Sequence, residues 1–448
     1  MQNLVTSAKI HLYIQTNLLL QIGCLLKILN EGDLLLFEKN LKNLLDNFYN
    51  YICDLLLNES ASQLESTLRF DYKQKGFSNL KTRPFTIQIA TGYTVNLETT
   101  YAGIVPDNWK ESRYPLSNHW GLISKASIAY IDKVCLSSVI APSYSTANEQ
   151  LKHFGINQST TRVRKLVKDV SIKVQNQEVK LSLKPEENLE GKRVVIALDG
   201  GRTRTRKYEG KTNEKGNAIY ETPWCEPKML VINVIDEKGE IDKKHLPIYG
   251  TRFSEEDILS LLKEYLSALK INKASQVQIL ADGAKWIWNN VRPILIDLGV
   301  APDKIIETLD YCHAVSYVHK LVDKLPSKYS EKEKSELKIE FKDKLWNGKS
   351  DEIVKKCRNL FKRKSKEVKR WINYLDRHQK RTQYADFKEN RLMCGSGIVE
   401  SGIRRIINLR FKNASTFWKN ENVEKLFFFR STFLSFRWGI FINNLNSA

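Results

Sequence analysis

The chain has 448 residues, 42% hydrophobic and 27% charged, which are ordinary proportions for a soluble globular protein with a sizeable core. Its 71 lysines and arginines against 51 acidic residues give a formal net charge of +20, which favours polyanionic partners, nucleic acid above all. The seven cysteines are scattered without a CxxC pair, which argues against a zinc ribbon or a disulfide framework and indicates a reducing compartment.

Residues 1–66 are predicted to be helical, because leucines recur at i, i+3 and i+4 through residues 34–57. This leucine face is expected to form core or an oligomer contact. The most apolar stretch, residues 17–37, is interrupted by polar side chains and lacks a basic leader and a cleavage site. Neither a membrane span nor a signal peptide is therefore expected.

Residues 67–185 form a candidate DNA-binding region. The alternating stretch FTIQIATGYTVNL predicts a β-hairpin. Residues 143–170 predict two helices joined by the tight turn FGINQS, and the second helix would carry Arg162, Arg164 and Lys165. The pattern fits a helix-turn-helix that reads DNA, and it equally fits an ordinary helical hairpin with a basic face.

Residues 186–325 read as the first part of an α/β core, with short apolar strands and intervening helices. Strands are predicted at residues 192–201, 228–241, 243–250, 275–282 and 304–310. Helices are predicted at residues 253–269, behind a serine cap, and 283–299. Three strands followed by alternating helix and strand predict an α/β fold with a mixed sheet and helices on its faces.

Residues 326–390 lack strand signals and are predicted to form a basic helical insertion, after which residues 391–448 return to the core. The run FKRKSKEVKR contains Lys362, Arg363 and Lys364. These side chains are expected to follow DNA phosphates from the solvated face of a helix, although the composition also resembles a nuclear address.

Three carboxylates stand out by position. Asp199 ends the first strand of the core, Asp282 ends the fourth, and Glu400 lies in the helix after a glycine-serine-glycine turn. Converging acidic groups repel one another unless a cation intervenes, and hard oxygen ligands suit Mg²⁺ or Mn²⁺. Two alternatives remain open: Asp282 as the turn residue that caps the next helix, and Glu400 in a salt bridge with Arg404.

Four segments together resemble the Mutator-like DDE transposases of bacterial insertion sequences. They are LDGGRTRTR (198–206), ADGAKWIW (281–288), LDYCHAVSYV (309–318) and GSGIVESGIRRIINLRFK (395–412). The resemblance covers about residues 190–440 and is much weaker over residues 1–140. It implies a ribonuclease H-like catalytic domain, interrupted before its glutamate by a long helical insertion.

The resemblance implies a catalytic, metal-binding triad of Asp199, Asp282 and Glu400, holding two Mg²⁺ or Mn²⁺ ions. Asp310 and His313 match the family's D-x-x-H signature and would support the site. Asp310 could instead simply cap a helix, and His313 could be a core histidine.

Basic and aromatic side chains near these motifs are expected to contact DNA. The three arginines that follow Asp199 alternate along one strand face, where they would grip the phosphates flanking the cut. The tryptophan of the C-terminal segment would stack on a base, or else belong to the core. The candidates here are Arg202, Arg204, Arg206, Arg404, Arg405 and Trp418.

The resemblance implies a DNA transposase that binds terminal inverted repeats, hydrolyses phosphodiester bonds at the element ends and transfers the freed strands to target DNA. Such an enzyme would act on double-stranded DNA in the bacterial cytoplasm, at the nucleoid, as a homo-oligomer and without a membrane partner. Two alternatives remain: a catalytically inactive DNA-binding relative, and a cellular nuclease or resolvase of the same fold.

Overall fold

The computed structural model describes residues 2–361, 363–412 and 418–447. The chain divides into two compact units, Met1–Lys173 with Leu445–Ala448, and Val174–Asn444. Of the five predicted parts, 67–185 and 391–448 each contribute to both units, because their last residues belong to the other unit.

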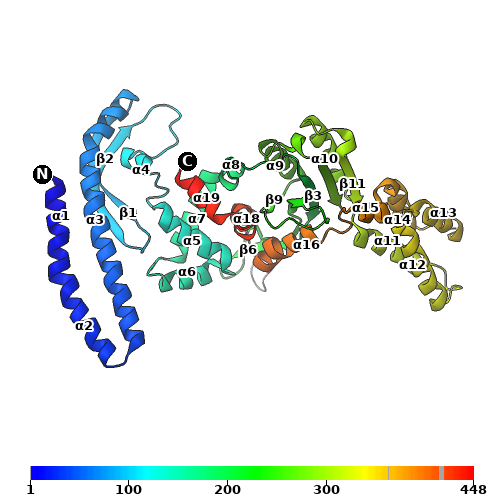
Figure 1. Ribbon diagram of the computed structural model, residues 1–448, viewed down its shortest axis with the longest axis horizontal. Coiled ribbons are helices and arrows are strands. Elements are labelled where there is room, and N and C mark those ends of the chain that lie inside the picture. The colour runs from blue at the N-terminus through cyan, green and yellow to red at the C-terminus, as the bar shows by residue number, and fades with distance from the viewer. Residues whose placement is uncertain (1, 362, 413–417, 448) are drawn as a thin grey trace. The chain divides into compact units, whose positions relative to one another are not determined.

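The first unit begins with long helices, coloured blue in Figure 1. They are α1 (Gln2–Tyr13), the π-helical turn η1 (Ile14–Leu18), α2 (Leu19–Asn30) and α3 (Leu34–Gln74). Gly32, at φ 83°, turns the chain, and the carboxylate of Asp33 accepts a hydrogen bond from the N–H of Leu36 to cap α3. The helical prediction for residues 1–66 is confirmed, and α3 continues eight residues further, to Gln74.

The helix Val5–Asn30 has 26 residues and is almost wholly exposed. Among the described residues, it alone is long and apolar enough to cross a membrane. The expectation that no part of the chain meets this test was wrong, because the apolar helix begins earlier than the stretch considered. Soluble core helices and oligomer helices pass the same test of length and composition, so this finding assigns no membrane partner.

The rest of the first unit is a hairpin followed by helices. The strands are β1 (Ser78–Gln88) and β2 (Thr94–Ile104), and the helices are α4 (Pro115–His119), α5 (Ile128–Ile140), α6 (Tyr144–His153) and α7 (Thr160–Val174). The predicted hairpin is confirmed, with antiparallel pairing. The predicted pair of helices is confirmed as α6 and α7, joined through Gly155 at φ 80°, and α7 exposes Arg162, Arg164 and Lys165. Its contact with DNA stays a prediction.

The second unit is built on a five-stranded mixed sheet, with the strand order β11-β10-β3-β8-β9. The strands are β3 (Arg193–Gly200), β8 (Lys228–Ile235), β9 (Ile248–Arg252), β10 (Gln276–Ala281) and β11 (Ile305–Leu309). β8 runs antiparallel to both β3 and β9, whereas β10 and β11 run parallel to β3. The predicted mixed sheet is therefore confirmed, and β3, β10 and β11 lie within one residue of their predicted bounds. β8 ends six residues earlier and β9 begins five residues later than predicted.

Helices cover both faces of this sheet (Figure 1). One face carries α9 (Glu255–Ala268) and α10 (Lys285–Asp297), and the other carries α16 (Gly397–Ile403) and α18 (Asn420–Leu434). Val194, Ile196 and Leu198 pack in the core beneath α9 and α10. Because side chains alternate along a strand, Asp199 points to the opposite side, where α16 lies. α16 approaches closely at Gly402, whose missing Cβ would meet Met229 at 2.3 Å.

Between β3 and β8 the chain leaves the sheet and folds into two short antiparallel ladders. Their strands are β4 (Thr203–Arg204) paired with β7 (Trp224–Cys225), and β5 (Lys207–Thr212) paired with β6 (Ala218–Glu221). The sequence did not predict these pairings. A short helix, α8 (Glu178–Ser182), and the 3-10 turns η2 (Ile271–Lys273) and η3 (Pro302–Lys304) complete the connections of the core.

The part predicted as a helical insertion, residues 326–390, is helical where the structure describes it, and the helical segment between β11 and α16 begins earlier than predicted, at Tyr311. Its helices are α11 (Tyr311–Asp323), α12 (Glu331–Trp346), α13 (Ser350–Leu360), α14 (Lys366–Arg377), the 3-10 turn η4 (Gln379–Arg381) and α15 (Tyr384–Glu389). After α16 the chain continues through the π-helical turn η5 (Arg404–Asn408), α17 (Leu409–Phe411), α18 and α19 (Trp438–Asn446).

Candidate metal centre

Three neighbouring parallel strands deliver an aspartate each to the same edge of the sheet. Ala281 of β10 is the register partner of Leu198 in β3 and of Leu309 in β11. The residues that follow these three are Asp199, Asp282 and Asp310. Because the three strands are parallel and in register, their carboxyl ends lie side by side. Two of these aspartates were predicted as catalytic, and Asp310 was predicted as supporting.

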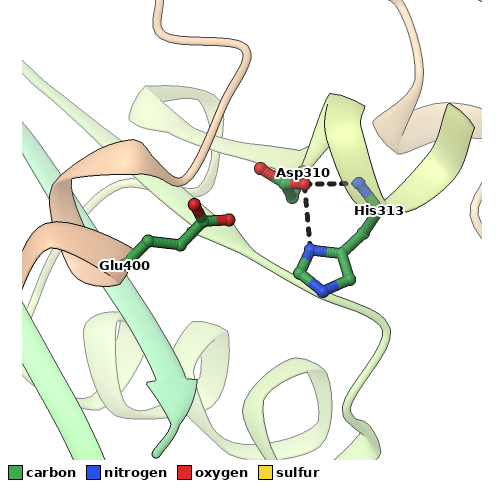
Figure 2. Close-up of side chains that lie close together, drawn as sticks. All are labelled: Asp310, His313 and Glu400. Carbon is green, nitrogen blue, oxygen red and sulfur yellow. Dashed lines mark hydrogen bonds and ion pairs between the residues drawn. The ribbon is translucent and has the colours of Figure 1, made fainter. Parts of the chain in front are cut away.

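Asp310 is buried at this edge of the sheet, with 1% of its surface exposed, and its carboxylate holds the neighbouring segments together. Its Oδ1 accepts hydrogen bonds from the backbone N–H of His313 at 2.6 Å and from Nδ1 of the same residue at 3.0 Å (Figure 2). Its Oδ2 accepts from the backbone N–H of Ser396 at 2.6 Å. Burial would raise the pKa of Asp310, but these hydrogen bonds outweigh it and lower the pKa to about 2. The predicted helix-capping role is confirmed, because Asp310 is the N-cap of α11.

The imidazole of His313 is held by Asp310 and is partly open to solvent. Its side chain is 39% exposed, so the alternative of a core histidine is wrong. The hydrogen bond to Asp310 raises the pKa of His313 to about 8, against burial and with help from the negative charges of Asp310, Asp282 and Asp199. His313 is therefore largely protonated at neutral pH, with Nε2 left unused by Asp310.

Glu400 lies in the first turn of α16, and its carboxylate faces Asp310 and His313 (Figure 2). Ser396 Oγ donates a long hydrogen bond to Glu400 Oε1 at 3.4 Å. Asp310, His313 and Glu400 each offer a possible ligand atom, and these atoms lie within 4.8 Å of one another. In the described part of the chain, Glu400 forms no ion pair with Arg404, so the salt-bridge alternative is wrong.

Asp199 and Asp282 lie near this group but are not among the residues whose possible ligand atoms all lie within 4.8 Å of one another. Oδ1 of Asp282 accepts from the N–H of Ala284 at 2.9 Å, which closes the turn, but Ala284 is the N-cap residue of α10. Oδ1 of Asp199 accepts from the N–H of Gly200 at 2.6 Å. Burial raises the pKa of Asp199 to about 6, and the negative charges of Asp282 and Glu400 add to the effect. Both aspartates thus share the electrostatic environment of Glu400.

The four carboxylates differ in how many of their oxygen atoms already accept hydrogen bonds within the fold. Both oxygens of Asp310 already accept hydrogen bonds inside the fold, so Asp310 is suited to positioning its neighbours. Asp199, Asp282 and Glu400 accept fewer hydrogen bonds, and none has a lysine or arginine ion partner among residues 2–361, 363–412 and 418–447. The predicted carboxylates do come to one edge of the sheet, and their catalytic role stays a prediction. The sequence did not predict that possible ligand atoms of Asp310, His313 and Glu400 lie within 4.8 Å of one another.

The helical insertion also reaches this edge, through a residue that the sequence did not indicate. A Cβ atom on Gly283, next to Asp282, would lie 1.9 Å from Cε2 of Tyr374 in α14. The ring of Tyr374 is stacked on Tyr317 of α11, with centroids 4.0 Å apart. Burial raises the pKa of Tyr374, and the charge of Asp282 raises it further. The contact is long-range in sequence, and the glycine after Asp282 was its only local signal.

The predicted DNA-contact residues differ in their exposure and in their contacts within the fold. Arg202, Arg204 and Arg206 are exposed and alternate with buried threonines, in agreement with the predicted strand face. Arg404 is exposed, whereas Arg405 donates to the hydroxyl of Tyr249 at 2.7 Å, which favours a structural role.

Trp418 is 7% exposed and packs against Phe411, with Arg410 over its ring. Burial of the ring favours the core alternative over stacking on a base. In the insertion, Arg363 is exposed, Lys364 is half-buried, and Lys362 lies outside the described residues.

No protein-family model matches the chain, and no curated protein matches its sequence. Among solved structures, the chain is similar to the Drosophila P element transposase strand transfer complex, with 12% sequence identity over 70% of this chain and 80% of that chain. The TM-score of 0.26 is too low for this likeness to bear on the fold or the function.

Proposed function

We propose that this protein is a DNA transposase that cleaves phosphodiester bonds at the ends of an insertion sequence and transfers the freed strands to target DNA. The carrying observation is the set of carboxylates at one sheet edge, where Asp199, Asp282 and Asp310 follow three parallel strands in register and Glu400 lies in the first turn of α16, facing Asp310. The mixed sheet, interrupted by a helical insertion before the helix of Glu400, is the architecture that a ribonuclease H-like DDE domain requires of this chain.

The donor set fits a divalent metal. Asp199, Asp282 and Glu400 offer hard oxygen atoms, and their mutual repulsion is relieved by a cation. Two bound Mg²⁺ or Mn²⁺ ions would activate the attacking hydroxyl and stabilise the leaving oxygen of the phosphodiester. Asp310 fixes the surrounding geometry through its hydrogen bonds to His313 and Ser396.

His313 supplies positive charge at this edge. Its Nδ1–H donates to Asp310, so the ring is oriented and its protonated form is favoured. A phosphate close to the carboxylates would be repelled by them, and the imidazolium offsets part of that repulsion. His313 thus helps an anionic substrate to approach an acidic site.

The DNA itself would be held by the excess of basic residues. The net charge of +20 favours duplex binding, and the exposed arginines after Asp199 lie next to the scissile phosphate in this proposal. Joining two terminal inverted repeats to one target requires at least a homodimer. The enzyme would work at the bacterial nucleoid, in the cytoplasm.

A cleavage assay tests the proposal. The substrate is a labelled duplex that joins one end of the element, as sequenced around the gene, to flanking DNA, with Mg²⁺ or Mn²⁺ present. Asp199→Asn, Asp282→Asn and Glu400→Gln should each abolish cleavage while duplex binding persists. Asp297→Asn, an exposed carboxylate at the end of α10, is the matched control and should cleave normally.

The products separate the proposal from its rivals. Joining of the cleaved end to a supercoiled target plasmid supports a transposase, whereas hydrolysis without joining supports a nuclease or resolvase. Duplex binding without cleavage in either metal would mean an inactive relative. Near wild-type cleavage by any one of the three variants would remove that residue from the triad.

A further inference from the structure

The two ladders between β3 and β8 form an exposed projection, which we call the arginine–aromatic arm, residues 202–224. It carries six basic and three acidic residues. At its root, Thr203 and Thr205 are buried while Arg202, Arg204 and Arg206 face solvent. The root of the arm therefore presents three arginines to solvent on one face of the chain.

Aromatic rings lie between these guanidinium groups. Trp224 is 52% exposed and is the cross-strand partner of Arg204. The guanidinium carbons of Arg202 and Arg204 lie 5.2 and 5.0 Å from the centroid of the Trp224 ring. Because Trp224 is largely exposed on a small two-stranded ladder, it contributes little to the hydrophobic core. Packing of the core therefore does not explain why a tryptophan lies here.

The alternation of charge and aromatic surface continues outward along the arm. The guanidinium of Arg206 lies 4.5 Å from the ring centroid of Tyr220, which in turn is 5.7 Å from the ring of Tyr208. Tyr208 is 49% exposed. None of the three arginines forms an ion pair with a carboxylate in the described part of the chain, so their positive charge is available to a ligand.

The root of the arm is attached firmly to the elements that carry the candidate metal centre. The N–H of Gly201 donates to the carbonyl of Pro227 at 2.8 Å, and a Cβ on Gly201 would lie 2.6 Å from Ile407 in η5. The N–H of Arg206 donates to the carbonyl of Trp418 at 2.8 Å. Arg202 follows Asp199 by only three residues, so the arm begins at the metal-centre edge.

We propose that the arginine–aromatic arm binds unpaired nucleotides of DNA beside the cleavage point, with a base stacked on Trp224 and the adjoining phosphates on Arg202 and Arg204. Aromatic rings bind unpaired bases through their faces, and guanidinium groups pair with phosphate oxygens. In an intact duplex the bases are stacked on one another, so Trp224 would distinguish frayed or single-stranded DNA from closed duplex. The location beside the cut rests on the proposed function, whereas the binding chemistry does not.

Binding is measured without catalysis, by fluorescence anisotropy of the full chain carrying Asp282→Asn, in EDTA. The probes are a labelled single strand of about 15 nucleotides, a blunt duplex, and the same duplex with a single-stranded overhang. Trp224→Ala should weaken binding of the single strand and the overhang duplex on the order of 5- to 100-fold, and binding of the blunt duplex less than about 2-fold. Trp224→Phe should lie between, because it keeps a smaller aromatic face.

Two controls separate stacking from charge and from folding. Phe436→Ala removes an equally prominent aromatic side chain, 75% exposed, and should leave all three affinities unchanged. Arg202→Ala with Arg204→Ala should weaken every probe and lower the salt dependence for the single strand by about 0.7 in log–log slope for each phosphate that is no longer neutralised. Unchanged melting temperatures would show that the fold of each variant is intact.

The proposal is overturned if Trp224→Ala leaves single-strand binding unchanged, or weakens blunt duplex and single strand equally. An effect of Trp224→Ala that Phe436→Ala reproduces would also overturn it. The proposed function is contradicted by a different result, namely cleavage that survives loss of the acidic triad. The two tests are independent, because the binding assay requires neither metal nor cleavage.

Discussion

The backbone N–H of Ser396 donates to Oδ2 of Asp310 at 2.6 Å, so one buried carboxylate joins the end of β11 to the start of the helix that carries Glu400. The same carboxylate binds His313 through its other oxygen. Asp310→Asn replaces one oxygen with a donor group, which leaves one of these N–H groups without an acceptor. We expect a loss of about 2–3 kcal/mol in the free energy of unfolding, measured by urea titration, together with weaker cleavage.

Asp303→Asn is the control for Asp310→Asn, since Asp303 is an exposed aspartate in η3, at the other end of β11. It should change neither stability nor cleavage. Wild-type stability of Asp310→Asn would show that the carboxylate does not hold α16 in place.

Divalent metal should stabilise the protein. Because a ligand that binds only the folded state raises its stability, the melting temperature should rise with Mg²⁺ or Mn²⁺ at about 5–10 mM. The gain should be smaller in Asp282→Asn, which lacks one charged ligand. Calcium should also stabilise but support cleavage poorly, because its coordination is larger and less rigid. Identical melting curves with and without metal would contradict a metal site at this edge.

The stability of the metal-free protein should fall as the pH rises past neutrality. His313 has a folded pKa of about 8, above its usual 6.5, so its contribution is complete below about pH 6.5 and is lost through pH 8. After allowance for its partial exposure, the loss is about 1 kcal/mol. His313→Gln should flatten this part of the curve, measured by denaturant titration in EDTA between pH 6 and 9; an unaltered slope would refute the assignment.

Asp199 gives a second pH dependence, in a lower range. Its folded pKa of about 6 is above the usual value of 3.8, so its contribution is complete below about pH 4 and is lost as the pH rises through 6. Asp199→Asn should therefore remove the decline in stability between pH 4 and 6 in EDTA. Mg²⁺ should reduce the same decline in the wild type, since it favours the ionised form. A decline that persists in the variant would assign it to other groups.

The insertion should bind DNA through phosphates. Alanine at Arg363, Lys364 and Lys366 should reduce the slope of log affinity against log salt by about 0.9 for each phosphate left without its basic partner. The measurement is anisotropy of a labelled duplex over a range of salt concentrations. Lys263→Ala, an exposed lysine of α9, should leave the slope as it is. An unchanged slope in the triple variant would exclude the insertion from the DNA-binding surface.

Gly283 should tolerate no side chain while Tyr374 is present. A Cβ there would lie 1.9 Å from a buried aromatic carbon, so Gly283→Ala must displace the turn that carries Asp282. We expect cleavage to fall by about 10-fold or more, as a misplacement on the order of 1 Å commonly costs. Tyr374→Ala combined with Gly283→Ala should restore part of this loss; a double variant no better than the sum of the singles would rule out the steric cause.

The strands of the sheet were predictable because their apolar runs end in polar turns, as in the residues before Asp199 and Asp282. The ladders at Lys207–Thr212 and Ala218–Glu221 were not, because their side chains are mostly exposed on both faces and give no alternation. The sequence therefore did not indicate Trp224 as a candidate. The equally polar residues around Trp418 suggested an exposed ring, but Trp418 is buried by its packing.

The sequence predicted that Asp199 and Asp282 end strands of one sheet, which the structure shows, but the arrangement of the candidate site depends on contacts between distant residues. The register of β3, β10 and β11 follows from pairing, which no local pattern specifies. The contact of Tyr374 with Gly283 joins residues 91 positions apart in the numbering, and the glycine itself shows that something approaches closely but not which residue does.

The two ends of the helical insertion touch each other. The N–H of Tyr311 donates to the carbonyl of Cys394 at 2.9 Å. Tyr311 directly follows Asp310, and Cys394 lies two residues before Ser396. The insertion therefore leaves and rejoins the core at neighbouring positions, and Asp310 contacts Ser396 although 86 positions separate them in the sequence. The insertion still bears on the site through Tyr374, whose ring lies against Gly283, next to Asp282.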